Sequence, residues 1–157
     1  MKTAIIIYSL GGNTRSVTTK MKEWLDADIY EIKTKVPYPQ DYDQMVEQGK
    51  IEVESGFMPE IEELNIDFSK YDSIVLGSPV WWYTFAPAMN AYLKNADFLG
   101  KKVYVFATNG GWLGHTLKDY EKKVKNTKIS GELNIRFNGT KLVTPIKEIE
   151  NFAKSIN

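Results

Sequence analysis

Short apolar runs rich in β-branched residues recur along the chain and predict buried strands. They lie at residues 4–8, 28–32, 73–77 and 102–107, with a weaker one at 132–137. A run that stays apolar, instead of alternating with polar residues, is typical of a strand that is covered on both faces. The pattern therefore predicts five strands.

Segments with helical spacing lie between these runs. The apolar positions recur every three or four residues, as expected for one buried face of a helix: Val17, Met21, Trp24 and Leu25; Met89, Tyr92 and Leu93; Leu117, Tyr120 and Val124. A last helix is expected at residues 146–156, preceded by Pro145 at a position that favours helix starts. Residues 33–70 are irregular, with a polar amphipathic helix predicted at 42–53.

The alternation of strands and helices predicts an α/β fold. Parallel neighbours in a sheet need crossover connections, and helices of about ten residues supply them on both faces. At 157 residues, without repeats, low-complexity tracts or a membrane-spanning segment, the chain is expected to form a single domain over residues 1–157.

Charge and cysteine content narrow the classes of function. Lys plus Arg and Asp plus Glu are 20 each, so the overall charge favours neither nucleic acid nor an anionic membrane as a partner. Because there is no cysteine, disulfides, thiolate metal sites and thiol nucleophiles are excluded. Redox chemistry would therefore need a bound cofactor. The N-terminal apolar run is too short for a signal peptide, so we expect a cytoplasmic protein.

Three loops are expected to meet at one edge of the sheet. In an open α/β sheet, ligands bind outside the carboxyl ends of the strands, where the strand order reverses. The loops that follow the first, third and fourth predicted strands are residues 9–14, 78–86 and 108–114.

The first of these loops has the composition of an anion site. Ser9, Leu10, Gly11, Gly12, Asn13 and Thr14 lead directly into a helix. Glycines before a helix N-terminus leave free N–H groups for a phosphate, and Ser9 and Thr14 add hydroxyls. Neither the Walker A pattern nor G-x-G-x-x-G is present, which disfavours a triphosphate or a dinucleotide. A plain turn with a capped helix is the alternative interpretation.

The second and third loops offer aromatic and glycine-rich surfaces. Trp81, Trp82 and Tyr83 follow the third strand, and Pro79 and Pro87 are expected to hold them outside helix and sheet. Successive side chains cannot all face one core, so at least one indole should face a ligand; ordinary packing is the alternative. Residues 108–112 either let a planar ligand approach the backbone or form a simple Asn-Gly turn. Together the loops fit a mononucleotide with a large flat ring.

These segments resemble the flavodoxins, in particular a bacterial branch whose third-strand loop reads G-x-P-x-W-W-Y. The resemblance covers essentially the whole chain, and the following segments carry it: residues 8–14, 38–42, 71–72, 77–83, Pro87 and 108–111. It implies a three-layer sandwich with a five-stranded parallel sheet of order 2-1-3-4-5, and FMN at the point where the order reverses.

The resemblance also implies roles for individual residues. Residues 9–14 would hold the FMN phosphate through amides and hydroxyls, and Pro79 and Val80 would contact the ribityl chain and the ring edge. Trp81, Trp82 or Tyr83 would flank the isoalloxazine together with residues 109–111. The implied cofactor-binding set is Ser9, Leu10, Gly11, Gly12, Asn13, Thr14, Ser78, Pro79, Val80, Trp81, Trp82, Tyr83, Thr108, Asn109, Gly110 and Gly111.

The chain departs from the typical flavodoxin in three ways. Gly11 replaces the usual Thr or Ser, which removes one hydroxyl from the phosphate loop. The chain is neutral, whereas typical flavodoxins are strongly acidic. The aromatic loop has no central glycine for the backbone flip of many flavodoxins.

Three functions follow from the resemblance. The first is electron transfer between redox partner proteins, and the second is an FMN-dependent NAD(P)H oxidoreductase that reduces a small acceptor such as a quinone. A weaker alternative is an interaction module without redox activity. No catalytic or metal-binding residue is expected. The spacing suggests no partners with which His115, the only histidine, could build a metal site or a catalytic triad, and residues 138–140 are interpreted as a turn.

Overall fold

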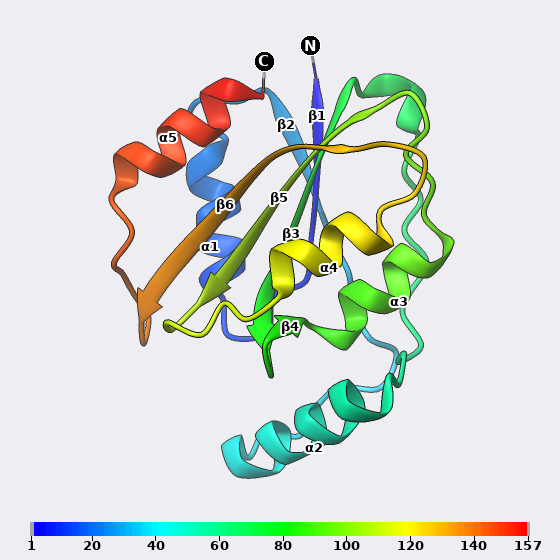
Figure 1. Cartoon of the computed structure of the whole chain (residues 1–157), viewed down its shortest axis with the longest axis vertical. Helices are drawn as coiled ribbons and strands as arrows, with labels where there is room; N and C mark the ends of the chain where they lie inside the picture. Colours follow the sequence, from blue (N-terminus) through cyan, green and yellow to red (C-terminus); the bar gives the residue numbers. More distant parts are fainter. Residues whose placement is uncertain (1, 157) are drawn as a thin grey trace.

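The protein forms an α/β domain in which helices cover both faces of a central sheet (Figure 1). The computed structural model describes residues 2–156. Its strands are β1 (Thr3–Ile7), β2 (Ala27–Glu31), β3 (Ser73–Trp81), β4 (Thr84–Phe85), β5 (Lys102–Asn109), β6 (Ile129–Asn138) and β7 (Lys141–Leu142). Its helices are α1 (Asn13–Met21), α2 (Tyr42–Ser55), α3 (Pro87–Asn95), α4 (Thr116–Lys123) and α5 (Ile146–Ser155), with a 3₁₀ turn at Phe68–Lys70.

The sheet has the predicted topology. Its long strands are parallel and follow the order β2-β1-β3-β5-β6, which is the expected order 2-1-3-4-5 when the five predicted strands are numbered along the chain. The prediction of five strands was too low, because β4 and β7 are short antiparallel additions to β3 and β6. Two-residue strands leave almost no hydrophobic pattern in the sequence.

Each face of the sheet has its own hydrophobic core. Helices α3 and α4 cover one face, with Met89, Leu93 and Tyr120 fully buried. Helices α1 and α5 cover the other, with Met21 and Ile149 equally buried. The strands are therefore apolar on both faces, which is the pattern that predicted them.

The segment 78–86 lies only partly outside helix and sheet, whereas Pro79 and Pro87 predicted that all of it would. Strand β3 continues through Pro79 to Trp81, the chain turns at Trp82 and Tyr83, and β4 pairs back onto β3. The last β1–β3 pair is Ile7 with Gly77, so β3 has no β1 neighbour beyond that point and the missing N–H of Pro79 is tolerated. Pro87 is the first residue of α3.

Helix α2 projects beyond the carboxyl ends of the strands, at the bottom of Figure 1. Its buried residues are Gly49 and Glu52, two in a helix of 14 residues, whereas the nine-residue helices α1 and α3 each bury four. Helix α1 ends at Met21, and Trp24 lies in the following turn, so this helix is shorter than its apolar spacing predicted. Among residues 2–156, no helix has the length and hydropathy needed to cross a bilayer.

Candidate cofactor site

The three predicted loops converge on one cavity at the carboxyl edge of the sheet. The cavity has a volume of about 380 Å³, which lies within the usual range for small-molecule sites. It is lined by Ser9, Leu10, Gly11, Asn13, Thr14, Tyr42, Met45, Pro79, Val80, Trp81, Thr108, Asn109, Gly110, Phe137 and Gly139. None of these residues carries a formal charge at neutral pH.

The first turn of α1 provides backbone donors at one end of the cavity. Gly12 is the N-cap residue, with a φ of 94° that favours glycine. The amide of Arg15 donates to Ser9 Oγ at 3.3 Å, whereas the amides of Asn13 and Thr14 belong to a turn that has no acceptor within the helix. Such amides, at the positive end of a helix dipole, form an anion site without a cation.

Hydroxyl groups add donors at the same end. Ser9 Oγ accepts a hydrogen bond from Arg15, so its own proton remains available. The hydroxyls of Thr14 and Thr108 are buried and lie 2.7 Å apart. One of them donates to the other, which leaves one hydroxyl proton of the pair for a ligand.

The Arg15 guanidinium is paired with a carboxylate. Arg15 is not part of the cavity lining and makes two hydrogen bonds to Glu31, one from Nε at 3.1 Å and one from Nη2 at 2.5 Å. This pairing raises the pKa of Arg15 further above its usual value. An anion at this helix start would therefore meet amides and hydroxyls and not the Arg15 guanidinium.

The glycine-rich third loop is an ordered turn held against β6. Asn109 Oδ1 accepts from the Gly111 amide at 2.9 Å, and Asn109 Nδ2 donates to Asn134 Oδ1 at 2.6 Å. The predicted Asn-Gly turn is thus present, and Asn109 and Gly110 also line the cavity. The two interpretations of this loop are compatible.

The three adjacent aromatic residues have different environments. Trp81 lines the cavity, and its indole packs against Gly49 of α2 and contacts the rings of Tyr8 and Tyr38 edge-on. Trp82 lies against α2 and donates from Nε1 to the Val46 carbonyl at 3.3 Å. Tyr83 is half exposed and does not line the cavity.

The turn that carries Trp82 and Tyr83 has an unusual backbone and is clamped by α4. Both residues have positive φ, 50° and 72°, a conformation that costs energy in bulky residues. The His115 amide donates to the Tyr83 carbonyl at 2.9 Å, and Thr84 donates to Asp119. The side chain of His115 pairs with Asp119, so this histidine helps to hold the turn.

The structure adds site residues that sequence reasoning missed. Tyr42 and Met45 come from the first turn of α2, and Phe137 and Gly139 come from the β6–β7 hairpin, where the Gly139 carbonyl accepts from Asn13 Nδ2 at 2.9 Å. Conversely, the cavity lining does not include Gly12, Ser78, Trp82, Tyr83 or Gly111. Ser78 is fully buried, where its hydroxyl accepts from the Ala86 amide and donates to the Pro79 carbonyl.

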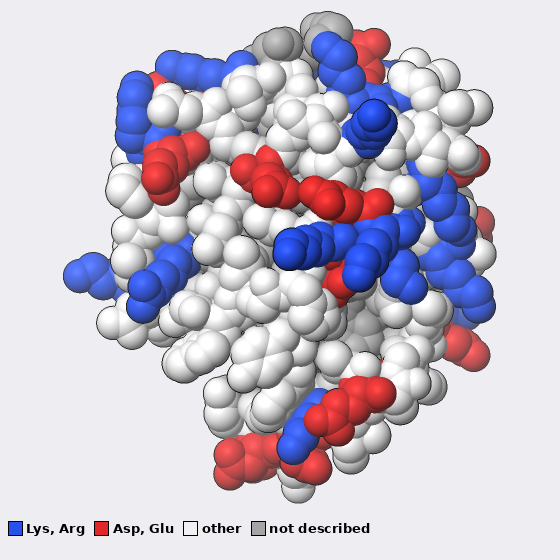
Figure 2. Space-filling model, viewed as in Figure 1, with Lys and Arg blue, Asp and Glu red and all other residues white. Residues whose placement is uncertain are grey.

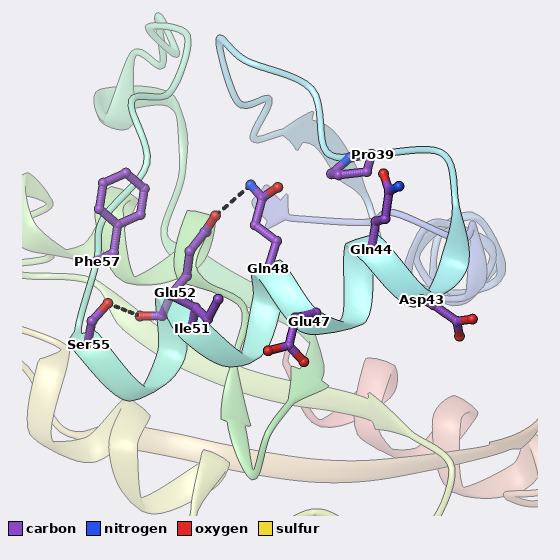
Figure 3. A pocket seen from close by; sticks show the side chains of 9 residues that line it. All are labelled: Pro39, Asp43, Gln44, Glu47, Gln48, Ile51, Glu52, Ser55 and Phe57. Carbon is purple, nitrogen blue, oxygen red and sulfur yellow. Dashed lines mark hydrogen bonds between the residues drawn. The ribbon is translucent and has the colours of Figure 1, made fainter.

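Further hollows border α2. A broad groove of about 770 Å³, called here the α2 groove, is lined by Pro39, Asp43, Gln44, Glu47, Gln48, Ile51, Glu52, Ser55 and Phe57 (Figure 3). A smaller slot of about 240 Å³ lies between α2 and the β3–β4 hairpin and shares Tyr42, Met45, Val80 and Trp81 with the cavity.

Neither sign of charge dominates the face drawn in Figure 2. On the face drawn in Figure 2, acidic and basic side chains are interspersed. Within residues 2–156, no group of three or more His, Cys, Asp or Glu side chains is arranged to hold a metal ion.

Comparison with known proteins identifies the family. The sequence profile described as flavodoxin matches residues 2–150, nearly the whole chain. The chain belongs to the flavodoxin family. No curated protein matches this flavodoxin significantly.

Solved structures agree with the family assignment. A flavoprotein from Lactobacillus acidophilus NCFM, crystallised in complex with FMN, shares 26% identity at a TM-score of 0.72, covering 85% of this chain and 92% of that one. A flavoprotein from Bacteroides eggerthii DSM 20697 has a TM-score of 0.77 at 22% identity, with 99% and 97% coverage. An archaeal flavodoxin has a TM-score of 0.59 at 14% identity, with 99% and 96% coverage. The last two likenesses concern the fold alone.

Proposed function

We propose that this flavodoxin binds FMN in the three-loop cavity and transfers electrons between redox partner proteins. The observation that carries the proposal is an uncharged cavity that has helix-start amides and hydroxyls at one end and Trp81 in its wall. A phosphate fits the first end and a flat ring fits the apolar walls. Family membership and the FMN-bound relative support the same cofactor.

The residues would divide the binding of FMN between them. Ser9, Gly11, Asn13 and Thr14 hold the phosphate through amides and hydroxyls. Pro79 and Val80, on the β3 extension, lie along the ribityl chain and the ring edge. Asn109 and Gly110 approach the ring through backbone, and bound FMN supplies one- and two-electron redox chemistry.

The cavity lining favours electron transfer over proton-transfer catalysis. It contains no Asp, Glu, His or Lys, so no side chain is placed to act as a general acid or base near neutral pH. Exposed apolar residues on the same loops, including Leu10 and the 70%-exposed Trp112, offer contact area to a partner protein. An electron carrier needs only such a contact between its own surface and that of its partner protein.

The slot beside the cavity favours the second candidate function, an NAD(P)H-dependent reductase. The slot is lined only by uncharged residues and shares Tyr42, Met45 and Trp81 with the cavity wall. A flat acceptor such as a quinone would fit next to the flavin there.

An anaerobic mixing experiment separates these functions. Purified protein loaded with FMN is combined with NADPH or NADH, and the flavin absorbance is followed. A carrier keeps its oxidised spectrum for minutes, although dithionite reduces it at once, whereas bleaching within seconds shows a reductase. If FMN fails to bind at all, both redox functions are wrong and an interaction module remains.

A further inference from the structure

A chain of contacts connects the cavity to the α2 groove through the protein interior. It starts at Trp81, which lines the cavity. The ring of Tyr38 meets the Trp81 ring edge-on, with centroids 5.0 Å apart and an interplanar angle of 80°. The Tyr38 hydroxyl then donates to Glu52 Oε1 at 2.7 Å, and Glu52 lines the α2 groove.

Glu52 is arranged as a proton acceptor. Each of its carboxylate oxygens accepts one hydrogen bond, Oε1 from Tyr38 and Oε2 from Gln48 Nε2 at 2.8 Å, which is the pattern of an ionised carboxylate. The residue is only 6% exposed. Figure 3 shows its side chain rising from α2 beside Gln48 in the groove.

Tyr38 is arranged as a donor of both an electron and a proton. Its ring is buried in the core against Trp81. Burial is the largest cause, and the hydrogen bond to Glu52 the second, that raises the pKa of Tyr38 well above its usual value. The phenol therefore keeps its proton in the resting protein. Oxidation of a phenol makes its O–H group strongly acidic, and a carboxylate at 2.7 Å is within reach to take the proton.

We propose that Trp81, Tyr38 and Glu52 form a relay that supplies an electron to light-excited FMN and moves a proton to the α2 groove. Trp81 gives one electron to the excited flavin, and Tyr38 returns one electron to Trp81. In the second step the Tyr38 O–H bond breaks and an O–H bond forms on Glu52. The net result is one electron on FMN, a neutral Tyr38 radical and a protonated Glu52; reversal of these transfers restores the resting state. The relay rests on the proposed binding of FMN for its electron acceptor.

The relay would protect the cavity from its own cofactor. An oxidised indole beside the flavin is open to irreversible attack, whereas the relay places the oxidised site on the buried Tyr38 ring. Light supplies the driving energy, so no chemical oxidant other than FMN is needed.

Flash photolysis of the FMN-loaded protein tests the relay directly. We expect a short-lived indole radical signal that converts into a phenoxyl radical signal. Tyr38→Phe abolishes the phenoxyl signal and prolongs the indole signal. Glu52→Gln keeps the ring contact but removes the proton acceptor, and it slows phenoxyl formation about a hundredfold, the lower end of what a positioned base contributes.

Two other Tyr→Phe substitutions serve as controls for Tyr38→Phe. Tyr8→Phe alters the other tyrosine that contacts Trp81, with ring centroids 5.8 Å apart, and Tyr104→Phe alters a buried ring on the opposite face of the sheet. Both should leave the phenoxyl signal unchanged. The relay is wrong if Tyr38→Phe leaves that signal intact, if either control removes it, or if Glu52→Gln leaves its rate unchanged.

A second experiment tests the transfer from Tyr38 to Trp81 independently of FMN binding. In the FMN-free protein, a variant that keeps Trp81 as its only tryptophan is oxidised by azide radicals from pulse radiolysis. Transfer from Tyr38 to Trp81 should appear here even if FMN does not bind, and its loss in Tyr38→Phe confirms the inner step. Absence of this transfer overturns the relay, whatever the outcome of FMN titrations.

Discussion

At the residue scale, the neighbours Gly11 and Gly12 differ in whether a side chain could be accommodated. A side chain at Gly11 would meet no atom within 4 Å, and its φ lies outside the left-handed region. Gly12 has a φ of 94° and caps α1. Gly12 is therefore needed for its backbone conformation, whereas Gly11 leaves an open position beside the helix-start amides.

We predict that Gly11→Ser strengthens FMN binding. The added hydroxyl can donate to the phosphate, and a hydrogen bond to a charged group contributes about 2 kcal/mol, roughly a tenfold to thirtyfold lower Kd. Fluorescence titration with FMN measures the change. Gly12→Ser is the matched control: it forces a side chain into the left-handed region and should weaken binding and lower the melting temperature. Equal effects of the two substitutions would contradict the assigned roles.

At the element scale, helix α2 and the β3–β4 hairpin support one another. Gly49 brings α2 directly onto the Trp81 indole, where an added Cβ would lie 3.3 Å from Cε3. Trp82 ties the hairpin to the Val46 carbonyl, and the Lys50 ammonium lies 5.3 Å from the centre of the Trp82 ring. Because Tyr42 and Met45 line the cavity from the same helix, the contact between α2 and Trp81 determines the position of the outer wall of the cavity.

We predict that Gly49→Leu weakens FMN binding more than it destabilises the fold. The larger side chain pushes α2 away from Trp81, and few residues of α2 are buried elsewhere. Glu54→Leu adds the same side chain at an exposed position of α2 and serves as the control. Calorimetric titration with FMN and thermal melts measure the two effects. A drop in stability without a change in affinity would show that α2 does not shape the cavity.

The sequence predicted much of these elements because local patterns encode them. Buried β-branched runs gave the five long strands and their crossovers, and the rule for open α/β sheets placed loops 9–14 and 108–111 at one edge. The prediction failed at Pro79. A proline is tolerated there because β1 ends before it can pair with this part of β3, and the local sequence does not show where a neighbouring strand ends. It also missed Tyr42 and Met45, because the seat of α2 depends on the Gly49–Trp81 contact across the fold.

At the scale of the whole molecule, buried tyrosines limit stability at high pH. Burial raises the pKa of Tyr120 and of Tyr92, and burial with the hydrogen bond to Glu52 raises that of Tyr38. A group whose pKa is higher in the folded state stabilises the fold below its unfolded pKa, 10.0 for tyrosine, and this stabilisation is lost as the pH rises above that value. The folded protein should therefore lose stability above about pH 10.

We predict that Tyr120→Phe makes the protein less sensitive to alkali. Tyr120 is fully buried, so the substitution removes an ionisation without removing the ring. Urea unfolding from pH 8 to about pH 11 should show a smaller loss of free energy in this variant than in the natural protein. Tyr42→Phe, at a 74%-exposed position, should follow the natural protein. An identical pH dependence of all three proteins would rule out Tyr120 as a source.

The central claim is that amides and hydroxyls at the carboxyl edge of the sheet hold the phosphate of FMN in an uncharged cavity. Calorimetric titration of the FMN-free protein with FMN, and in parallel with riboflavin, tests it most directly. We expect one FMN site, affinity for riboflavin weaker by about a hundredfold or more, because several hydrogen bonds to the phosphate are lost, and little change with salt. Equal affinity for the two ligands, or no heat of binding with FMN, would contradict it.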